Sequence, residues 1–336
     1  MIFKQTGGEQ WSFNQNWMQQ QHSNGQPIHV CDWHGISCDQ TKSIVGITLG
    51  ANNLKGKLPT EIFMLPNLES LSFFGNKNLE ISLEGIDNAE NLRSLILDST
   101  KLISLQGVGK ARSLTELNVE NNNLIGSLPD ELGRLINLES LSVSKNKFTG
   151  TIPYWINNLP SLETFLAAEN KFEGPVPHLA NFKRLTYVDF SDNDLNGWVP
   201  MNFLQSVNNE EKIVVDLSRN KIEGSLPREL ARLDRITIHL QDNHISEVDK
   251  ELCIAVGWND FDVERYGCDG ILCPVGSSSV AGRQTSETTA CEPCKEAKYM
   301  GSTACGSSGA AGVSLNVFCS SLSLITTTIV GMAMLL

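Results

Sequence analysis

The sequence predicts a repeat solenoid of the α/β class, in which short parallel strands stack side by side into one concave sheet. Three observations predict this fold. An apolar pattern recurs through most of the 336 residues, an asparagine stands at a fixed place in nearly every copy, and all nine cysteines lie outside the repeating region. A solenoid of this length needs no single large core, because each unit packs only against its neighbours.

The repeating pattern is LxxLxLxxNxL, and successive units begin 22 to 27 residues apart. The nine units open at Ile44, Leu68, Leu92, Leu114, Leu138, Leu162, Leu185, Lys212 and Arg235. We expect the apolar fourth and sixth positions to point inward from a short strand, and the residues between them to point outward. The sixth positions form one apolar column: Leu49, Phe73, Leu97, Val119, Val143, Ala167, Phe190, Leu217 and Leu240. Nine stacked units are therefore expected over residues 44–252.

The ninth position of the pattern is asparagine in every unit except the third, where Thr100 replaces it. The asparagines are Asn52, Asn76, Asn122, Asn146, Asn170, Asn193, Asn220 and Asn243. An amide side chain both donates and accepts hydrogen bonds. At this position it can satisfy backbone groups that the turn leaves unpaired inside the stack.

Six units continue with the segment Gly-x-apolar-Pro, the first at Gly56 to Pro59 and the last at Gly224 to Pro227. With this segment the chain resembles the plant-type leucine-rich repeat, LxxLxLxxNxLxGxIPxxLGxL, of receptor-like and polygalacturonase-inhibitor-like proteins. The resemblance implies a right-handed superhelix with a second strand and short 3₁₀ or loop segments on the convex side. The second and third units lack the segment, so we expect their convex side to differ.

The cysteines mark the two ends of the array, which is typical of disulfide-closed caps formed in an oxidising compartment. Residues 1–43 resemble the N-terminal cap of the same family, in which Trp11, Trp17 and Trp33 would cover the first repeat and Cys31 would bond Cys38. Residues 253–305 resemble the cysteine-rich C-terminal cap of algal and protist repeat proteins. That resemblance implies three pairs, with other connectivities left open: Cys253 with Cys268, Cys273 with Cys291, and Cys294 with Cys305.

The end of the chain is a small-residue linker, 306–312, followed by a mostly apolar tail, 313–336, which contains Cys319. Two interpretations stay open for the tail: a GPI lipid-anchor signal, or a transmembrane helix of about 20 apolar residues. Both place the repeats outside the membrane, at the cell surface. The first residues, MIFKQTGGEQW, show no signal peptide, so we expect the chain to begin inside a longer protein.

The sequence contains no catalytic signature of the kinds HExxH, G-x-S-x-G, P-loop or kinase, and its net charge of -12 disfavours nucleic acid. We expect no enzymatic activity, no cofactor and no metal. The leading hypothesis is a receptor-like protein without a kinase, which binds a protein, peptide or glycan and acts through partners such as a co-receptor. The alternative, also implied by the family resemblance, is an inhibitor of a secreted cell-wall-degrading hydrolase.

The candidate binding surface is the concave face, where the outward positions of successive units stack. Four residues would anchor a ligand through apolar contacts: Phe74, Ile96, Leu166 and Tyr187. Acidic residues outnumber Arg93, Lys145 and Arg219 there. They are Glu69, Asp98, Glu116, Glu120, Glu139, Glu163, Glu169, Asp189, Asp192, Asp216 and Asp242.

This face predicts a basic or polar partner, and a merely solvated surface is the competing interpretation. Asp189, Asp216 and His239 fall at the fifth position of adjacent units, where they would hold a cation or accept hydrogen bonds from the ligand.

Overall fold

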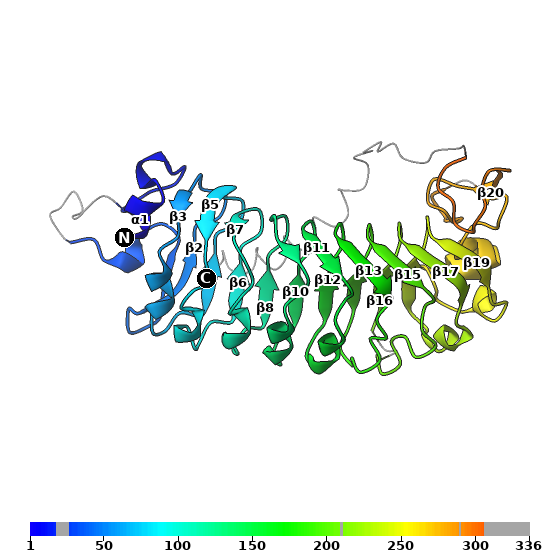
Figure 1. Ribbon diagram of the computed structural model, residues 1–336, viewed down its shortest axis with the longest axis horizontal. Coiled ribbons are helices and arrows are strands. Elements are labelled where there is room, and N and C mark those ends of the chain that lie inside the picture. The colour runs from blue at the N-terminus through cyan, green and yellow to red at the C-terminus, as the bar shows by residue number, and fades with distance from the viewer. Residues whose placement is uncertain (18–26, 209–210, 289, 306–336) are drawn as a thin grey trace. The chain divides into compact units, whose positions relative to one another are not determined.

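The structure is a computed structural model that describes residues 1–17, 27–208, 211–288 and 290–305. Residues 1–305 form one unit, in which successive coils of the chain stack along a single axis (Figure 1). The linker 306–312 and the tail 313–336, with Cys319, lie outside the described residues.

One side of each coil is a short strand, and these strands form a ten-stranded sheet (Figure 1). All neighbours from β2 onward are parallel, and equivalent positions of successive units lie opposite each other. Only β1, which belongs to the N-terminal cap, pairs antiparallel. The predicted solenoid is confirmed. The order is β1 (Ile36–Cys38), β2 (Ile44–Thr48), β4 (Ser70–Ser72), β6 (Ser94–Ile96), β8 (Glu116–Asn118), β10 (Ser140–Ser142), β12 (Thr164–Leu166), β14 (Tyr187–Asp189), β16 (Ile213–Asp216) and β18 (Ile236–His239).

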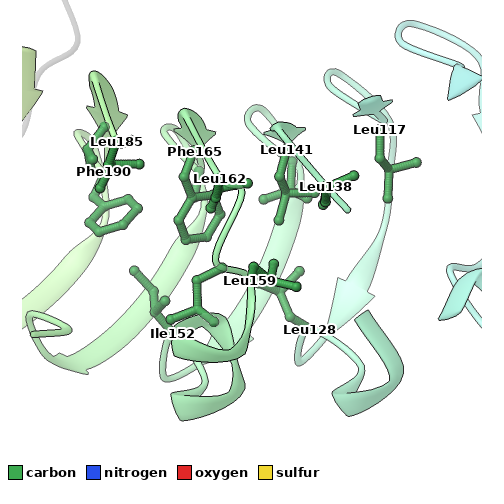
Figure 2. Packing of buried hydrophobic residues seen from close by; sticks show 14 of the residues in the cluster. Leu117, Leu128, Leu138, Leu141, Ile152, Leu159, Leu162, Phe165, Leu185 and Phe190 are labelled. Atoms are coloured by element: carbon green, nitrogen blue, oxygen red, sulfur yellow. The ribbon is translucent and has the colours of Figure 1, made fainter. Parts of the chain in front are cut away.

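The core lies between this sheet and the convex side of the coils. Every fourth-position and sixth-position side chain is at most 1 % exposed, as the alternation of strand side chains predicts. Figure 2 shows Leu117, Leu141 and Phe165 projecting from successive strands toward residues of the convex segments such as Leu159. The rings of Phe165 and Phe190 meet edge to face, with 5.0 Å between their centroids. The leucine columns therefore form one continuous core.

The ninth-position asparagines join each unit to the one before it. At Asn146, Nδ2 donates to the carbonyl oxygens of Val119 (3.0 Å) and Val143 (3.1 Å), while Oδ1 accepts from the N–H of Leu124 (3.1 Å). The same three kinds of bond recur at Asn122, Asn170, Asn193, Asn220 and Asn243. These amides satisfy buried backbone groups, which is the role that the sequence predicts for them.

Thr100 can stand in place of asparagine because the turn of the preceding unit satisfies its own backbone N–H group. One additional residue separates Asn76 from its next apolar residue, Leu79, and the N–H of Leu79 bonds to the carbonyl oxygen of Asn76 (2.9 Å). No amide oxygen is needed from position 100. The hydroxyl of Thr100 donates to the carbonyl oxygen of Leu97 (2.8 Å).

On the convex side, the length of the 3₁₀ helices depends on whether the unit contains a Gly-x-apolar-Pro segment. Four 3₁₀ helices of five residues begin directly after the proline of such a segment, since proline has a fixed φ and no N–H that would need a partner. The units that lack the segment have 3₁₀ helices of only three residues, η4 (Ile86–Asn88) and η5 (Val108–Lys110). The longer helices are η3 (Thr60–Met64), η6 (Asp130–Arg134), η7 (Tyr154–Asn158) and η8 (Arg228–Arg232).

A second strand in each coil builds two smaller sheets. The first contains β3 (Lys55–Lys57), β5 (Asn78–Ile81) and β7 (Lys101–Leu102). The second contains β9 (Ile125–Gly126), β11 (Lys147–Gly150), β13 (Lys171–Pro175), β15 (Asp194–Gly197), β17 (Lys221–Leu226) and β19 (His244–Val248). The interruption between β7 and β9 follows the two units without Gly-x-apolar-Pro. The irregularity that the sequence predicts is therefore a break in the second sheet.

The N-terminal cap contains α1 (Ile2–Gln5) and the 3₁₀ helices η1 (Gly8–Gln10) and η2 (Val30–Asp32). Trp11 is buried in the core, and its ring lies 4.9 Å from that of Trp17. Trp33 packs on Trp17, with 4.9 Å between their rings, and is absent from the core that covers the first repeat. The expectation that all three tryptophans cover the first repeat is therefore wrong for Trp33. Cys31 bonds Cys38.

The C-terminal cap contains η9 (Leu252–Ile254), α2 (Asp262–Tyr266), η10 (Gly267–Gly270), β20 (Ser277–Ser278) and β21 (Glu292–Pro293). Its disulfides are those that the family resemblance implies: Cys253–Cys268, Cys273–Cys291 and Cys294–Cys305. Asn259 covers the open edge of β18, since its N–H donates to Ile236 and its Oδ1 accepts from the N–H of Ile238. An uncovered edge would invite pairing with another chain. Across the described ranges, we find no helix with the length and apolar character that crossing a membrane requires.

Candidate binding face

The structure divides the predicted residues of the concave face into three rows. The strands themselves carry Ile96, Glu116, Leu166, Tyr187, Asp189, Asp216 and His239. The row that precedes the strands holds Glu69, Arg93, Glu139 and Glu163. The row that follows them holds Phe74, Asp98, Glu120, Lys145, Glu169, Asp192, Arg219 and Asp242. The expectation that all of them project from the sheet is therefore wrong, because most strands span only the third to fifth positions.

The row after the strands lies on a turn. The eighth-position residues Lys145, Glu169, Asp192, Arg219 and Asp242 have φ values of 53° to 55°, in the left-handed region. This conformation bends the chain away from the sheet directly after the strand. Their charges consequently line a rim of the concave face.

Ion pairs neutralise part of the negative charge on both rims. Lys145 lies 2.9 Å from Glu120 and 3.9 Å from Glu169. Arg219 binds both carboxylate oxygens of Asp192, through Nε at 2.6 Å and Nη2 at 2.5 Å. Arg184 pairs with Glu163 on the opposite rim. Arg184 directly precedes the first position of its unit and so falls outside the repeat pattern, and the face is less negative than the repeat positions alone indicate.

The N-terminal half of the face carries mostly small polar side chains on its strands, such as Ser70 and Ser94, together with the apolar residues Phe74 and Ile96. Phe74 lies across the strand end of the preceding unit, where a Cβ atom on Gly50 would come within 2.1 Å of its ring. Glycine at position 50 is therefore what allows the ring to lie flat there. Phe74 remains 40 % exposed, and Ile96 is partly exposed. This half can contact an apolar side chain of a ligand.

A polar hollow of about 330 Å³ runs along the rim that precedes the strands. It lies over the third to sixth units, and Arg93 and Glu139 of the predicted set both line it. The complete lining is Asn91, Arg93, Ser113, Thr115, Asn137, Glu139 and Ser161. The hollow offers hydrogen-bond donors and acceptors rather than an apolar pocket.

The C-terminal half of the face brings three predicted residues together. Asp189 lies opposite Asp216 on the neighbouring strand, and Asp216 lies opposite His239 on the next. Oδ1 of Asp189 accepts from the N–H (3.0 Å) and the hydroxyl (2.6 Å) of Ser191. Oδ1 of Asp216 accepts equivalent bonds from Ser218, at 2.9 and 2.6 Å. These bonds fix the orientation of both carboxylates.

Burial shifts the titration of this group. It raises the pKa of Asp189, with a further increase from the charge of Asp216, and it raises the pKa of Asp216 as well. Burial lowers the pKa of His239 to about 4, assisted by Arg283, and raises the pKa of Tyr187 to about 12, assisted by both aspartates. At neutral pH, an uncharged imidazole and a protonated phenol therefore flank two carboxylates whose ionised form is disfavoured by desolvation.

Sequence reasoning missed Thr237, which lies on the outward side of β18 two residues before His239. The side chain is 6 % exposed, and its hydroxyl has no hydrogen-bond partner within the described ranges. A threonine at a third position carries no signal by itself, since its burial depends on the packing around the last strand.

Coil geometry, the asparagine ladder and the Gly-x-apolar-Pro segments together define a leucine-rich repeat fold, and the chain is similar to proteins of the plant type. A family model described as leucine rich repeat matches residues 112–172. A probable leucine-rich repeat receptor-like protein kinase of Arabidopsis thaliana is 48 % identical over 48 residues, which is 14 % of this chain and 5 % of the relative.

Two solved ectodomains of Arabidopsis thaliana receptor kinases are similar in structure. That of GASSHO1/SCHENGEN3, in complex with CASPARIAN STRIP INTEGRITY FACTOR 2, is 25 % identical with a TM-score of 0.64, and the match covers 74 % of this chain and 30 % of that one. That of HAESA, in complex with an IDA peptide hormone, is 28 % identical with a TM-score of 0.62, and the match covers 69 % and 40 %. The chain thus spans less than half of each of these proteins.

Proposed function

We propose that this protein is a receptor-like binding protein of the cell surface, which recognises a peptide or protein on its concave face and catalyses no reaction. The observation that carries the proposal is the different chemistry near the two ends of one continuous concave face. Phe74 and Ile96 present apolar surface near the N-terminal end, and Asp189 and Asp216 present carboxylates near the C-terminal end.

An extended ligand that lies across the strands would meet both halves. An apolar side chain would contact the first half, and a basic segment would be attracted to the second. The similar ectodomain of HAESA was solved with a peptide hormone ligand, and that of GASSHO1/SCHENGEN3 with CASPARIAN STRIP INTEGRITY FACTOR 2, which supports a peptide or protein ligand here too. A co-receptor is the expected means of passing on the binding event.

Charge reversal on the concave face should abolish ligand capture. In Glu116→Lys/Glu163→Lys/Asp189→Lys, three carboxylates that would attract a basic ligand become repulsive ammonium groups. We expect peptides selected on the unmodified protein from a random displayed library to bind this variant at least tenfold more weakly, as measured by interferometry.

The matched control applies the same charge change to another side of the coils, in Glu84→Lys/Glu173→Lys/Glu223→Lys. These three glutamates are exposed, and the last two lie on the second sheet. Binding by the control should stay within twofold of the unmodified protein. Equal binding by both triple variants would exclude the concave face as the recognition surface.

We also propose that residues 306–336 are the signal for a glycolipid anchor, which replaces the apolar tail at a small residue of the linker. Small residues in the linker and an apolar tail without charged residues support this proposal. Phosphatidylinositol-specific phospholipase C should then release the protein from intact cells into the medium, as detected by immunoblotting. Complete retention on the cells would contradict the lipid anchor and favour a transmembrane helix.

A further inference from the structure

We propose that Tyr187, Asp189, Asp216 and His239 form a pocket for one arginine side chain of the ligand. This inference rests on the proposed recognition by the concave face and specifies which group of the ligand that face would bind. The pocket lies on β14, β16 and β18, at the end of the sheet next to the C-terminal cap (Figure 1).

The two aspartates provide a pair of oriented acceptors. They lie opposite each other on neighbouring strands, which are about 4.8 Å apart in any sheet. Serine bonds occupy Oδ1 of each carboxylate, and Oδ2 of each accepts no hydrogen bond from the described residues. Two oxygens therefore remain to accept hydrogen bonds from a ligand.

No ion pair joins either aspartate to a base among the described residues, although the charge of Arg219 partly offsets the increase that burial causes in the pKa of both. The bases whose charges act on this group are each bound to another carboxylate: Arg219 to Asp192, Arg283 to Asp262 (2.9 Å) and Lys212 to Asp260 (2.6 Å). Both carboxylates are half-buried, and partial desolvation without a paired cation costs free energy. The raised pKa of both aspartates agrees with this picture, and a cation from the ligand would relieve the cost.

An independent observation at the same place is the buried hydroxyl of Thr237. It lies on the outward side of β18, opposite Val214, which in turn lies opposite Tyr187. The hydroxyl finds no partner in the described part of the chain, although the residue is only 6 % exposed. An unsatisfied buried polar group costs about 1–3 kcal/mol. A ligand group that reached this hydroxyl would supply the missing hydrogen bond; Ser142 on β10 of the same face has an equally unpartnered hydroxyl among the described residues.

The spacing favours a guanidinium over a metal ion. A metal needs its ligand atoms close together, yet those of Asp189, Asp216 and His239 do not lie within 4.8 Å of one another. Across the described ranges only Cys294, Glu296 and Cys305 meet that distance, and a disulfide joins the two cysteines. A guanidinium is a flat fork with five N–H groups, so it can bridge two separate carboxylates while its face packs on a tyrosine ring.

The test measures binding of acetyl-arginine amide by saturation-transfer NMR and titration calorimetry. The uncharged isostere acetyl-citrulline amide serves as the reference ligand. We expect acetyl-arginine amide to bind the unmodified protein at least tenfold more tightly than acetyl-citrulline amide. Asp189→Asn/Asp216→Asn, which preserves the acceptors for Ser191 and Ser218, should remove that preference. Thermal unfolding checks that the variant retains its fold.

The control for diffuse electrostatics is Glu173→Gln/Glu223→Gln, which removes the same charge from two exposed positions on the second sheet, outside the concave face. It should bind acetyl-arginine amide as the unmodified protein does. Equal losses in both double variants, or equal binding of the citrulline compound, would overturn the pocket and leave recognition by the concave face standing. Failure of the charge-reversal experiment described above would instead contradict the proposed function itself.

Discussion

Replacing Phe165 with alanine is expected to lower the free energy of unfolding by about 3–5 kcal/mol, because the site cannot collapse around the missing ring. The side chain is fully buried, and its strand is paired with β10 on one side and β14 on the other. Its ring meets that of Phe190 edge to face, a contact that adds about 0.5–1.5 kcal/mol beyond simple burial. The cavity would be enclosed by residues of three successive coils (Figure 2).

Urea unfolding followed by circular dichroism measures this loss. The control is Phe13→Ala, which removes the same atoms from a ring that is 59 % exposed, and we expect it to change stability by less than about 1 kcal/mol. In a stacked array, each coil contacts only its neighbours. The substitution at Phe165 should therefore destabilise the coils in the middle of the array more than those at its ends. A cost for Phe165→Ala as small as that of Phe13→Ala would contradict the packing of the core column.

The position of each residue within its repeat could be predicted, because the repeat is defined by residue types that recur at fixed spacing. The repeat places leucine at the first, fourth and sixth positions and asparagine at the ninth. This combination fits one arrangement of the coil, so the sheet, the core and the asparagine hydrogen bonds could be predicted from the sequence. The caps are partly readable in the same way, since cysteines at both ends predict closure by disulfides.

The closing of the last strand could not be predicted from the sequence. Asn259, Asp260 and Phe261 follow one another with φ values of 49°, 59° and 69°; asparagine and aspartate adopt this region singly, but no local pattern predicts three such residues in a row. Trp258 holds this turn in place, since it is fully buried and its Nε1 donates to the carbonyl oxygen of Leu233 (2.6 Å). Tertiary packing therefore imposes the conformation of this segment.

The residues that line the candidate site could be predicted from the sequence. The net charge of the site could not, because it depends on ion pairs between coils. The fifth-position column correctly brings together Asp189, Asp216 and His239. The pattern does not reveal that the eighth position bends onto a rim, or that Arg184 reaches Glu163. Such contacts depend on side chains of adjacent coils, which the repeat leaves free to vary.

Replacing Asn146 with alanine is expected to lower the free energy of unfolding by about 2–4 kcal/mol, since a buried donor and several carbonyl groups lose their partners together. The amide of Asn146 links three segments of two successive coils, and the residue is only 8 % exposed. Asn123→Ala is the matched control, because Asn123 is exposed in the preceding turn. We expect it to change stability by less than about 0.5 kcal/mol in the same urea experiment.

Asn146→Thr tests why Thr100 is tolerated in the third unit. A threonine hydroxyl can still donate to the carbonyl oxygen of Val143, as Thr100 does to that of Leu97. It cannot supply the oxygen that accepts from the N–H of Leu124, and the preceding turn lacks the additional residue with which Leu79 bonds to Asn76. We therefore expect a loss of about 1–3 kcal/mol, between those of the two alanine variants. A loss no larger than that of Asn123→Ala would show that the length of the preceding turn does not decide which residue the ninth position accepts.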